Sequence, residues 1–206
     1  MNPSSSQAPL LRLHDLGFAY PGSPAPVFTH LAADLPAGVA LVCGDEGTGK
    51  STLLRLLAGQ LQPAQGRLLW QAQPLQAGQV AWFDAQDPAR QQQVVQQILD
   101  ELLPRPPAEL KTLLDELGLV PHLGKPLYQL STGSRRKVFL AAVLSAGAPL
   151  TLVDQPFMAL DGPSIQALTT RFQAWQGQAE RLLLIADYLP PEGLALSATL
   201  DLDRLH

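Results

Sequence analysis

The chain has 206 residues, 46% hydrophobic and 16% charged, which is typical of one globular domain or of a domain with a smaller lobe. Its net charge of −4 argues against nucleic acid as a partner, because nucleic-acid binding calls for a basic surface. The single cysteine, Cys43, excludes a disulfide framework and favours a reducing compartment.

The first 35 residues predict a flexible tail followed by two strands. Residues 1–9 are rich in serine and proline, and they lack the basic segment and apolar segment of a signal peptide. Apolar and polar residues alternate over 11–16, as in a half-buried strand, and residues 27–35 predict a second short strand. Since no apolar run has the length of a membrane span, we expect a soluble protein that reaches a membrane only through a partner.

The strongest motif of the chain is G-x-x-x-x-G-K-[ST] at residues 44–51, the phosphate-binding P-loop. It stands between an apolar strand at 39–43 and a helix-like run at 53–59, as its mechanism requires. Its glycines let backbone N–H groups surround a phosphate chain, and the helix N-terminus adds a partial positive charge. Lys50 is expected to bridge the outer phosphates, and the Ser51 hydroxyl to ligate Mg²⁺. The predicted nucleotide-binding residues are Gly44, Gly47, Thr48, Gly49, Lys50, Ser51 and Thr52.

The segment after the P-loop predicts two more strands and then a change to helices. Residues 67–70 and 80–83 are expected to complete an antiparallel layer around the strand that precedes the P-loop. Helices follow at 91–103 and 109–117. We therefore expect one domain over residues 10–206, with a helical lobe at 87–129 inserted between the core segments 10–86 and 130–206.

The last third of the chain predicts helices that alternate with strands. A helix over 135–145 leads to an apolar strand at 150–154, and a helix over 165–176 leads to a strand at 181–186, with an edge strand at 199–202. Such alternation indicates a parallel sheet covered by helices on both faces. The predicted fold class is α/β: a P-loop NTPase core with a mostly parallel sheet, an antiparallel β layer and an inserted helical lobe.

Three further motifs narrow the function. The run Leu130-Ser131-Thr132-Gly133-Ser134 opens a helix, an apolar strand ends on Asp154-Gln155-Pro156, and Ala159-Leu160-Asp161 follows. Together with the P-loop, these motifs resemble the ATP-binding cassette (ABC) ATPase subunit over nearly the whole chain. The resemblance implies a subunit that binds ATP and Mg²⁺ and pairs head to tail with a second ATP-binding subunit, as a homodimer or heterodimer. It also implies a separate membrane permease as partner and a cytoplasmic location at the inner face of the membrane.

The resemblance also implies roles for single residues. Tyr20 corresponds to the aromatic residue that stacks on adenine, and Gln86 to the glutamine that senses Mg²⁺ and links the core to the helical lobe. Asp154 corresponds to the aspartate that holds Mg²⁺ through water, so the implied metal-site residues are Ser51, Gln86 and Asp154. Asp161 lies in the loop that contacts the opposite subunit.

The run at 130–134 resembles the family's L-S-G-G-Q signature, which contacts the γ-phosphate held by the P-loop of the opposite subunit. Ser131 and Gly133 match the signature, whereas Thr132 and Ser134 depart from it. A serine and a glycine at a helix start provide a second phosphate-binding N-terminus, which the family uses in trans.

Two departures concern hydrolysis. The family has a glutamate after the strand-end aspartate, where this chain has Gln155, and a histidine where it has Asp187. A glutamine can orient water but cannot accept its proton, and a carboxylate facing a γ-phosphate repels it unless it is protonated or turned away. We therefore expect weak hydrolysis by this chain alone. The alternative is a non-hydrolytic regulatory partner in a heterodimer whose other cassette is intact.

Several of these residues also have a purely structural interpretation. Tyr20 is compatible with surface packing, Gln86 with an ordinary loop position, and Asp154 with a structural cap. Ser131 is a favoured residue for capping its own helix, and Asp161 can begin the next one.

Overall fold

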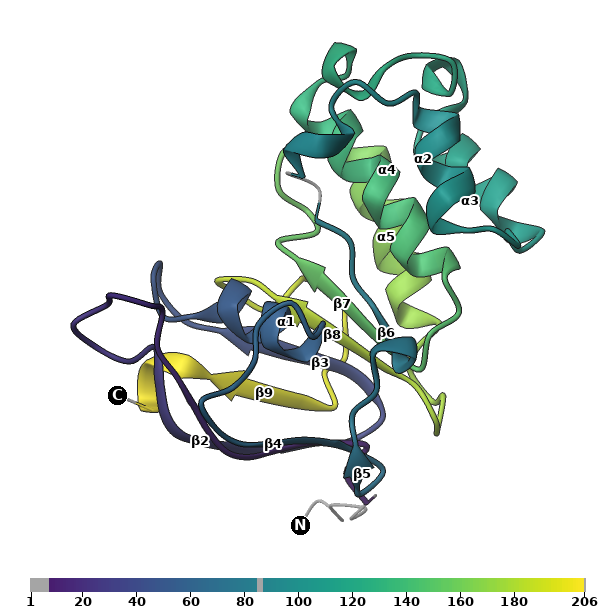
Figure 1. Cartoon of the computed structure of the whole chain (residues 1–206). Coiled ribbons are helices and arrows are strands. Elements are labelled where there is room, and N and C mark those ends of the chain that lie inside the picture. The colour runs from purple at the N-terminus through teal and green to yellow at the C-terminus, as the bar shows by residue number, and fades with distance from the viewer. Residues whose placement is uncertain (1–7, 85–86, 206) are drawn as a thin grey trace.

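Five parallel strands form the central sheet, in the order β6-β7-β8-β3-β9 (Figure 1). The computed structural model describes residues 8–84 and 87–205. All five strands run in the same direction, so their carboxyl ends lie at one edge of the sheet. The strands are β3 (Gly38–Cys43), β6 (Val80–Ala81), β7 (Leu150–Asp154), β8 (Leu182–Ala186) and β9 (Ala198–Asp201).

Helices cover both faces of this sheet. In β3, Val39 and Leu41 belong to one apolar cluster and Ala40 and Val42 to the other, as the two-residue period of a strand requires. The cluster around Val39 includes side chains of four helices, whereas α1 contributes to the opposite cluster. This arrangement confirms the predicted α/β class. The helices are α1 (Lys50–Leu57), α2 (Val95–Leu102), α3 (Glu109–Glu116), α4 (Thr132–Ser145) and α5 (Gly162–Gln173).

A second, antiparallel sheet packs on the α1 side, in the order β2-β1-β4-β5. Apolar side chains of β1 and β2 share a cluster with α1 and with Leu152 and Leu184 of the central sheet. The antiparallel layer thus covers the helix that follows the P-loop. The strands are β1 (Leu11–Phe18), β2 (Phe28–Leu35), β4 (Gln65–Trp70) and β5 (Gln73–Pro74).

The assignment of residues 80–83 to the antiparallel layer is wrong. Only Val80 and Ala81 form a strand, β6, and they pair in parallel with Leu150 and Thr151 of β7. A short helical turn, η1 (Ala77–Gln79), connects β5 to β6 at the edge of the central sheet. A short apolar run carries no periodicity that tells which sheet it joins.

The helical segment begins later than its composition predicts. Residues 91–94 are not helical, because their carbonyl groups pair with a distant segment: Gln91 accepts from Tyr128 N at 3.0 Å and Gln93 from Leu127 N at 2.9 Å. Two short turns, η3 (Val120–His122) and η4 (Leu127–Gln129), lie between α3 and α4. None of the helices formed by the described residues has the length and apolar character to cross a membrane.

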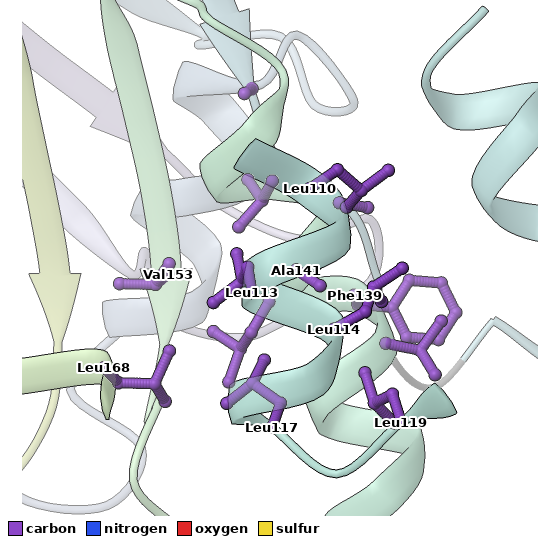
Figure 2. Close-up of a cluster of buried hydrophobic side chains, with 14 of the residues drawn as sticks. Leu110, Leu113, Leu114, Leu117, Leu119, Phe139, Ala141, Val153 and Leu168 are labelled. Carbon is purple, nitrogen blue, oxygen red and sulfur yellow. The ribbon is translucent and has the colours of Figure 1, made fainter. Parts of the chain in front are cut away.

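One apolar cluster joins the helical segment to the central sheet (Figure 2). The predicted flexible tail, residues 1–9, lies mostly outside the described residues. The division into core segments and a helical lobe at 87–129 stays a prediction. The labelled members of the cluster are Leu110, Leu113 and Leu114 of α3, Leu117 and Leu119 just after that helix, Phe139 and Ala141 of α4, Val153 of β7 and Leu168 of α5.

Gly66 is required for the close approach of β4 to β1. Its φ is 84°, and a Cβ at this position would lie 2.2 Å from the carbonyl oxygen of Asp15. Gly59 also has a positive φ, 73°, but no atom lies within 4 Å of its Cβ position.

We expect Gly59→Ala to lower the free energy of unfolding by about 1 kcal/mol through backbone strain. Gly66→Ala should lower it by about 1–3 kcal/mol more, because the strand must move.

Urea denaturation of both variants beside the wild type measures this difference. Equal losses of stability in the two variants would contradict the close approach of Gly66 to Asp15.

Candidate functional site

The candidate site lies where the carboxyl ends of β3, β7 and β8 meet. Two backbone hydrogen bonds hold these ends together: Asp187 N donates to Val42 O at 3.0 Å, and Gln155 N donates to Ala186 O at 2.8 Å. The loops that leave the three strands therefore share one edge of the sheet. Ligands commonly bind parallel sheets at such an edge.

The P-loop lies between β3 and α1, with positive φ at Gly44, Gly47 and Gly49. Lys50 is buried, and its Nζ donates to the carbonyl oxygens of Gly44 and Asp45, both at 2.7 Å. The ammonium group is thus held inside the curve of its own loop. The side chains of Asp45 and Glu46 are exposed.

Other members of the motif support the loop. The Thr48 hydroxyl donates to Asp45 O at 2.9 Å, which closes the turn. The Thr52 hydroxyl lies 3.0 Å from the Tyr20 hydroxyl, in a hydrogen bond that either group can donate. The ring of Tyr20 meets that of Phe18 edge to face at 5.0 Å. Tyr20 is therefore fixed beside the P-loop helix while its side chain remains partly exposed.

The fold brings Ser51 and Asp154 together although they are 103 residues apart in sequence. The Ser51 hydroxyl donates to Asp154 Oδ2 at 2.6 Å. A hydroxyl and a carboxylate are oxygen ligands of the kind that Mg²⁺ prefers, and Mg²⁺ commonly uses one or two carboxylates together with substrate phosphates. This pair fits that donor set. Among the described residues, no group of three or more histidine, cysteine, aspartate or glutamate side chains forms a metal cluster of its own.

Gln155 follows Asp154 in the chain, and Arg136 contacts the backbone of both residues. Gln155 has a φ of 45°, an unusual value for a residue other than glycine. Its carbonyl oxygen accepts from Arg136 Nη1, which also donates to the carbonyl oxygen of Asp154 at 3.3 Å. Burial lowers the pKa of Arg136. The arginine therefore fixes the turn that orients Gln155, a role that no motif in the sequence indicated.

Asp187 directly follows β8, where the predicted strand over 181–186 placed it. Burial raises the pKa of its carboxyl group, and the charge of Asp154 adds to that rise. Its Oδ1 accepts from the backbone N–H of Tyr188 at 2.8 Å. The ring of Tyr188 lies 4.4 Å from Lys50 Nζ, so this aromatic residue, unassigned from the sequence, belongs to the phosphate site.

A cavity of about 230 Å³ opens beside these groups, between the central sheet and α4. Polar and apolar side chains both contribute to its wall. They include Ser51, Arg55, Asp84, Arg136, Phe139 and Asp154.

The signature residues lie against the loop after β7. Ser131 caps α4 by accepting from Ser134 N at 3.1 Å, and the Ser131 hydroxyl donates to the Ser134 hydroxyl. A Cβ at Gly133 would lie 2.3 Å from the carbonyl oxygen of Ala159, while Thr132 is exposed. No hydrogen bond between residues 131–134 and the P-loop occurs within the described chain.

Asp161 joins this loop to two helices. It accepts from Ser164 N at 2.9 Å and so caps α5, and it pairs with Lys137 of α4 at 2.5 Å. These contacts, the Lys137 hydrogen bond first, hold the pKa of Asp161 well below its usual range. Gln86, the remaining candidate, lies outside the described residues.

The C-terminal turn η5 (Leu202–Leu205) supplies one contact that the sequence did not indicate. Both carboxylate oxygens of Asp203 accept from the backbone N–H of Asp45, at 3.0 and 3.1 Å. Asp203 also borders Gly44, the first residue of the P-loop motif. It therefore anchors the beginning of the loop from the far end of the chain.

Comparison with known proteins decides the family. The family model described as ABC transporter matches residues 29–158. The chain belongs to the ABC transporter ATP-binding family. An ABC transporter ATP-binding protein of Haemophilus influenzae is 32% identical over 197 residues, which cover 91% of this chain and 79% of that protein.

A second relative of this ABC chain is the cytochrome c biogenesis ATP-binding export protein CcmA of Salmonella typhi. It is 33% identical over 149 residues, covering 69% of this chain and 73% of the relative. A solved ATP-binding subunit of an ABC transporter has the same fold, with a TM-score of 0.74 at 22% identity over 86% of this chain and 79% of that one. The family binds ATP, and its ATP-binding subunits dimerise and work with membrane permeases.

The anchor at Asp203 predicts a local change in the P-loop. We expect Asp203→Ala to speed hydrogen exchange of the Asp45 amide about fivefold, because a hydrogen bond contributes about 1 kcal/mol. Arg204→Ala is the matched control, since Arg204 pairs with Asp201 and not with the P-loop. Exchange rates from NMR or mass spectrometry measure the effect. Unchanged exchange in Asp203→Ala, or equal acceleration in Arg204→Ala, would contradict the anchor.

The raised pKa of Asp187 predicts a pH-dependent stability. A carboxyl group with a raised pKa in the folded state stabilises the protein when protonated, and that contribution is lost as pH rises through its folded pKa. Asp187→Asn does not titrate, so it should gain stability over the wild type as pH rises from about 4, the ordinary aspartate range, to 7.5.

Urea denaturation across this pH range measures the gain. Asp115→Asn, on the exposed face of α3, controls for the loss of one negative charge. The prediction is wrong if the advantage of Asp187→Asn is constant with pH or larger in acid.

Proposed function

We propose that this chain couples binding of MgATP to a separate membrane permease, as one half of a head-to-tail pair of ATP-binding subunits at the inner face of the membrane. The observation that carries the proposal is the Ser51–Asp154 hydrogen bond of 2.6 Å beside the buried Lys50. A P-loop lysine, a hydroxyl and a strand-end carboxylate are the groups that P-loop ATPases use for phosphates and Mg²⁺. Membership of the ABC family supports the same conclusion.

In this proposal the P-loop backbone and Lys50 bind the phosphate chain, and Tyr20 stacks on adenine. Ser51 and Asp154 hold Mg²⁺, together with Gln86. The metal neutralises charge on the outer phosphates when it is bound. Tyr20 is suited to its role because its hydroxyl is tied to Thr52 and its ring is partly exposed.

The signature residues act on the nucleotide of the opposite subunit in this proposal. Ser131, Thr132, Gly133 and Ser134 begin α4, and a helix N-terminus favours an anion. Gly133 lies against Ala159 and Asp161 pairs with Lys137, so the signature and the loop after β7 can meet a partner as one surface. We propose core segments 10–86 and 130–206 and a helical lobe at 87–129 as the parts of this subunit.

We also propose that hydrolysis by the isolated chain is slow. The amide of Gln155 has no site that accepts a proton from water, and Arg136 fixes the backbone around it. Asp187, in place of a histidine, brings a second carboxyl group near Asp154. General acid–base help accounts for about 10²–10⁴-fold in rate, so the loss of these groups leaves binding intact and turnover weak.

ATPase assays of the purified chain test this account. We expect wild-type turnover far below the usual enzyme range of about 1–10³ per second. Gln155→Glu alone should stay slow because Asp187 remains. The double variant Gln155→Glu with Asp187→His should be at least about 100-fold faster than the wild type. Removal of Mg²⁺ with EDTA should abolish that gain, and Lys50→Ala sets the background.

Ordinary turnover by the wild-type chain would overturn the proposed slow hydrolysis. Light scattering with and without ATP gives an independent readout, since the proposal expects an ATP-dependent dimer. An ATP-bound dimer in which neither the wild type nor the double variant turns over would favour the alternative, a regulatory half of a heterodimer. Absence of ATP binding would overturn the function itself.

A further inference from the structure

The Lys50 ammonium group has three partners among the described residues. An ammonium group has three N–H donors, and two of them go to the carbonyl oxygens of Gly44 and Asp45 at 2.7 Å. The ring of Tyr188 lies 4.4 Å from the same nitrogen, within the range of a cation–π contact. The aromatic ring therefore takes the third position around Lys50.

The backbone of Tyr188 is fixed, but its side chain is not enclosed. Asp187 N donates to Val42 O at 3.0 Å, and Tyr188 N donates to Asp187 Oδ1 at 2.8 Å, so the chain is held at the end of β8. The Tyr188 residue nevertheless exposes 46% of its surface. Its ring can thus leave Lys50 without disturbing either apolar cluster, to which Tyr188 does not belong.

A phosphate bound to Lys50 would compete with the Tyr188 ring for the ammonium group. The two carbonyl groups belong to the loop that curls around the lysine, whereas the ring contacts the ammonium group from a separate strand end. A phosphate oxygen forms a charge-assisted hydrogen bond, which is stronger than a cation–π contact at a partly exposed site, so a bound phosphate would displace the ring. The free energy of the lost cation–π contact reduces the net binding free energy of the phosphate.

We propose that Tyr188 is an affinity-determining residue of the phosphate site, because its ring competes with the outer phosphates of a nucleotide for Lys50. The inference rests on the proposed function, since it requires nucleotide binding at the P-loop. Tyr188 lowers the affinity for ATP and ADP, whose outer phosphates reach the lysine. It has no effect on AMP, which lacks them.

Nucleotide binding to the full chain, by calorimetry for ATP and ADP and by competition for AMP, tests the proposal. Tyr188→Ala should bind ATP and ADP about two- to fivefold more tightly, the fold-change of a cation–π contact at an exposed site. Tyr188→Phe keeps the ring and should remain close to the wild type. Leu189→Ala is the matched control. Leu189 is the next residue after Tyr188, is 74% exposed and lies outside the apolar clusters.

Three results would overturn the role of Tyr188. The first is an unchanged or lower ATP affinity in Tyr188→Ala with an unchanged melting temperature. The second is an equal gain for AMP, which would indicate a general widening of the site. The third is an equal gain in Tyr188→Phe, which would assign the effect to the hydroxyl group. If the folded wild type binds no ATP, the proposed function fails and this role fails with it; if it binds ATP, only the role of Tyr188 is at stake.

Discussion

The parallel pairing of β7 with β8 and of β8 with β3 determines where every group of the phosphate site lies. This pairing brings three strand ends to one edge of the sheet, and each strand delivers a different group: β3 the P-loop, β7 Asp154 and β8 Asp187. A slip of one residue between β7 and β8 would turn Asp154 to the other face of the sheet. The buried apolar side chains on both faces prevent such a slip, so the core positions the site.

The two carboxyl groups at this edge have different surroundings. Asp154 accepts a hydrogen bond from Ser51, and the two side chains together offer oxygen ligands of the kind that Mg²⁺ prefers. Asp187 is partly buried and close to Asp154, and both circumstances favour its neutral form. One carboxyl group is thus suited to a cation and the other is less repulsive to a phosphate than its formal charge suggests. Two positive groups of the site, Lys50 and Arg136, are engaged by backbone carbonyl oxygens.

The sequence predicted those features that depend on neighbouring residues. The P-loop glycines, the strand that ends on Asp154 and the helix that opens at residues 130–134 follow from local patterns, and the structure has them. The placement of β6 could not be predicted, because two apolar residues carry no sign of which sheet they join. The contacts of Asp203 and Tyr188 with the P-loop required the order of strands and the direction of side chains, which no short motif encodes.

The packing of Gly133 against Ala159 changes how a signature variant should be interpreted. Any side chain at Gly133 would collide with the carbonyl oxygen of Ala159, a residue of the same chain with a φ of 61°. A substitution at Gly133 would therefore deform the loop between β7 and α5 before a second subunit is present. Loss of activity in such a variant is not evidence for contact across a dimer. Replacement of the exposed Thr132 leaves that loop intact and gives cleaner information about what lies opposite.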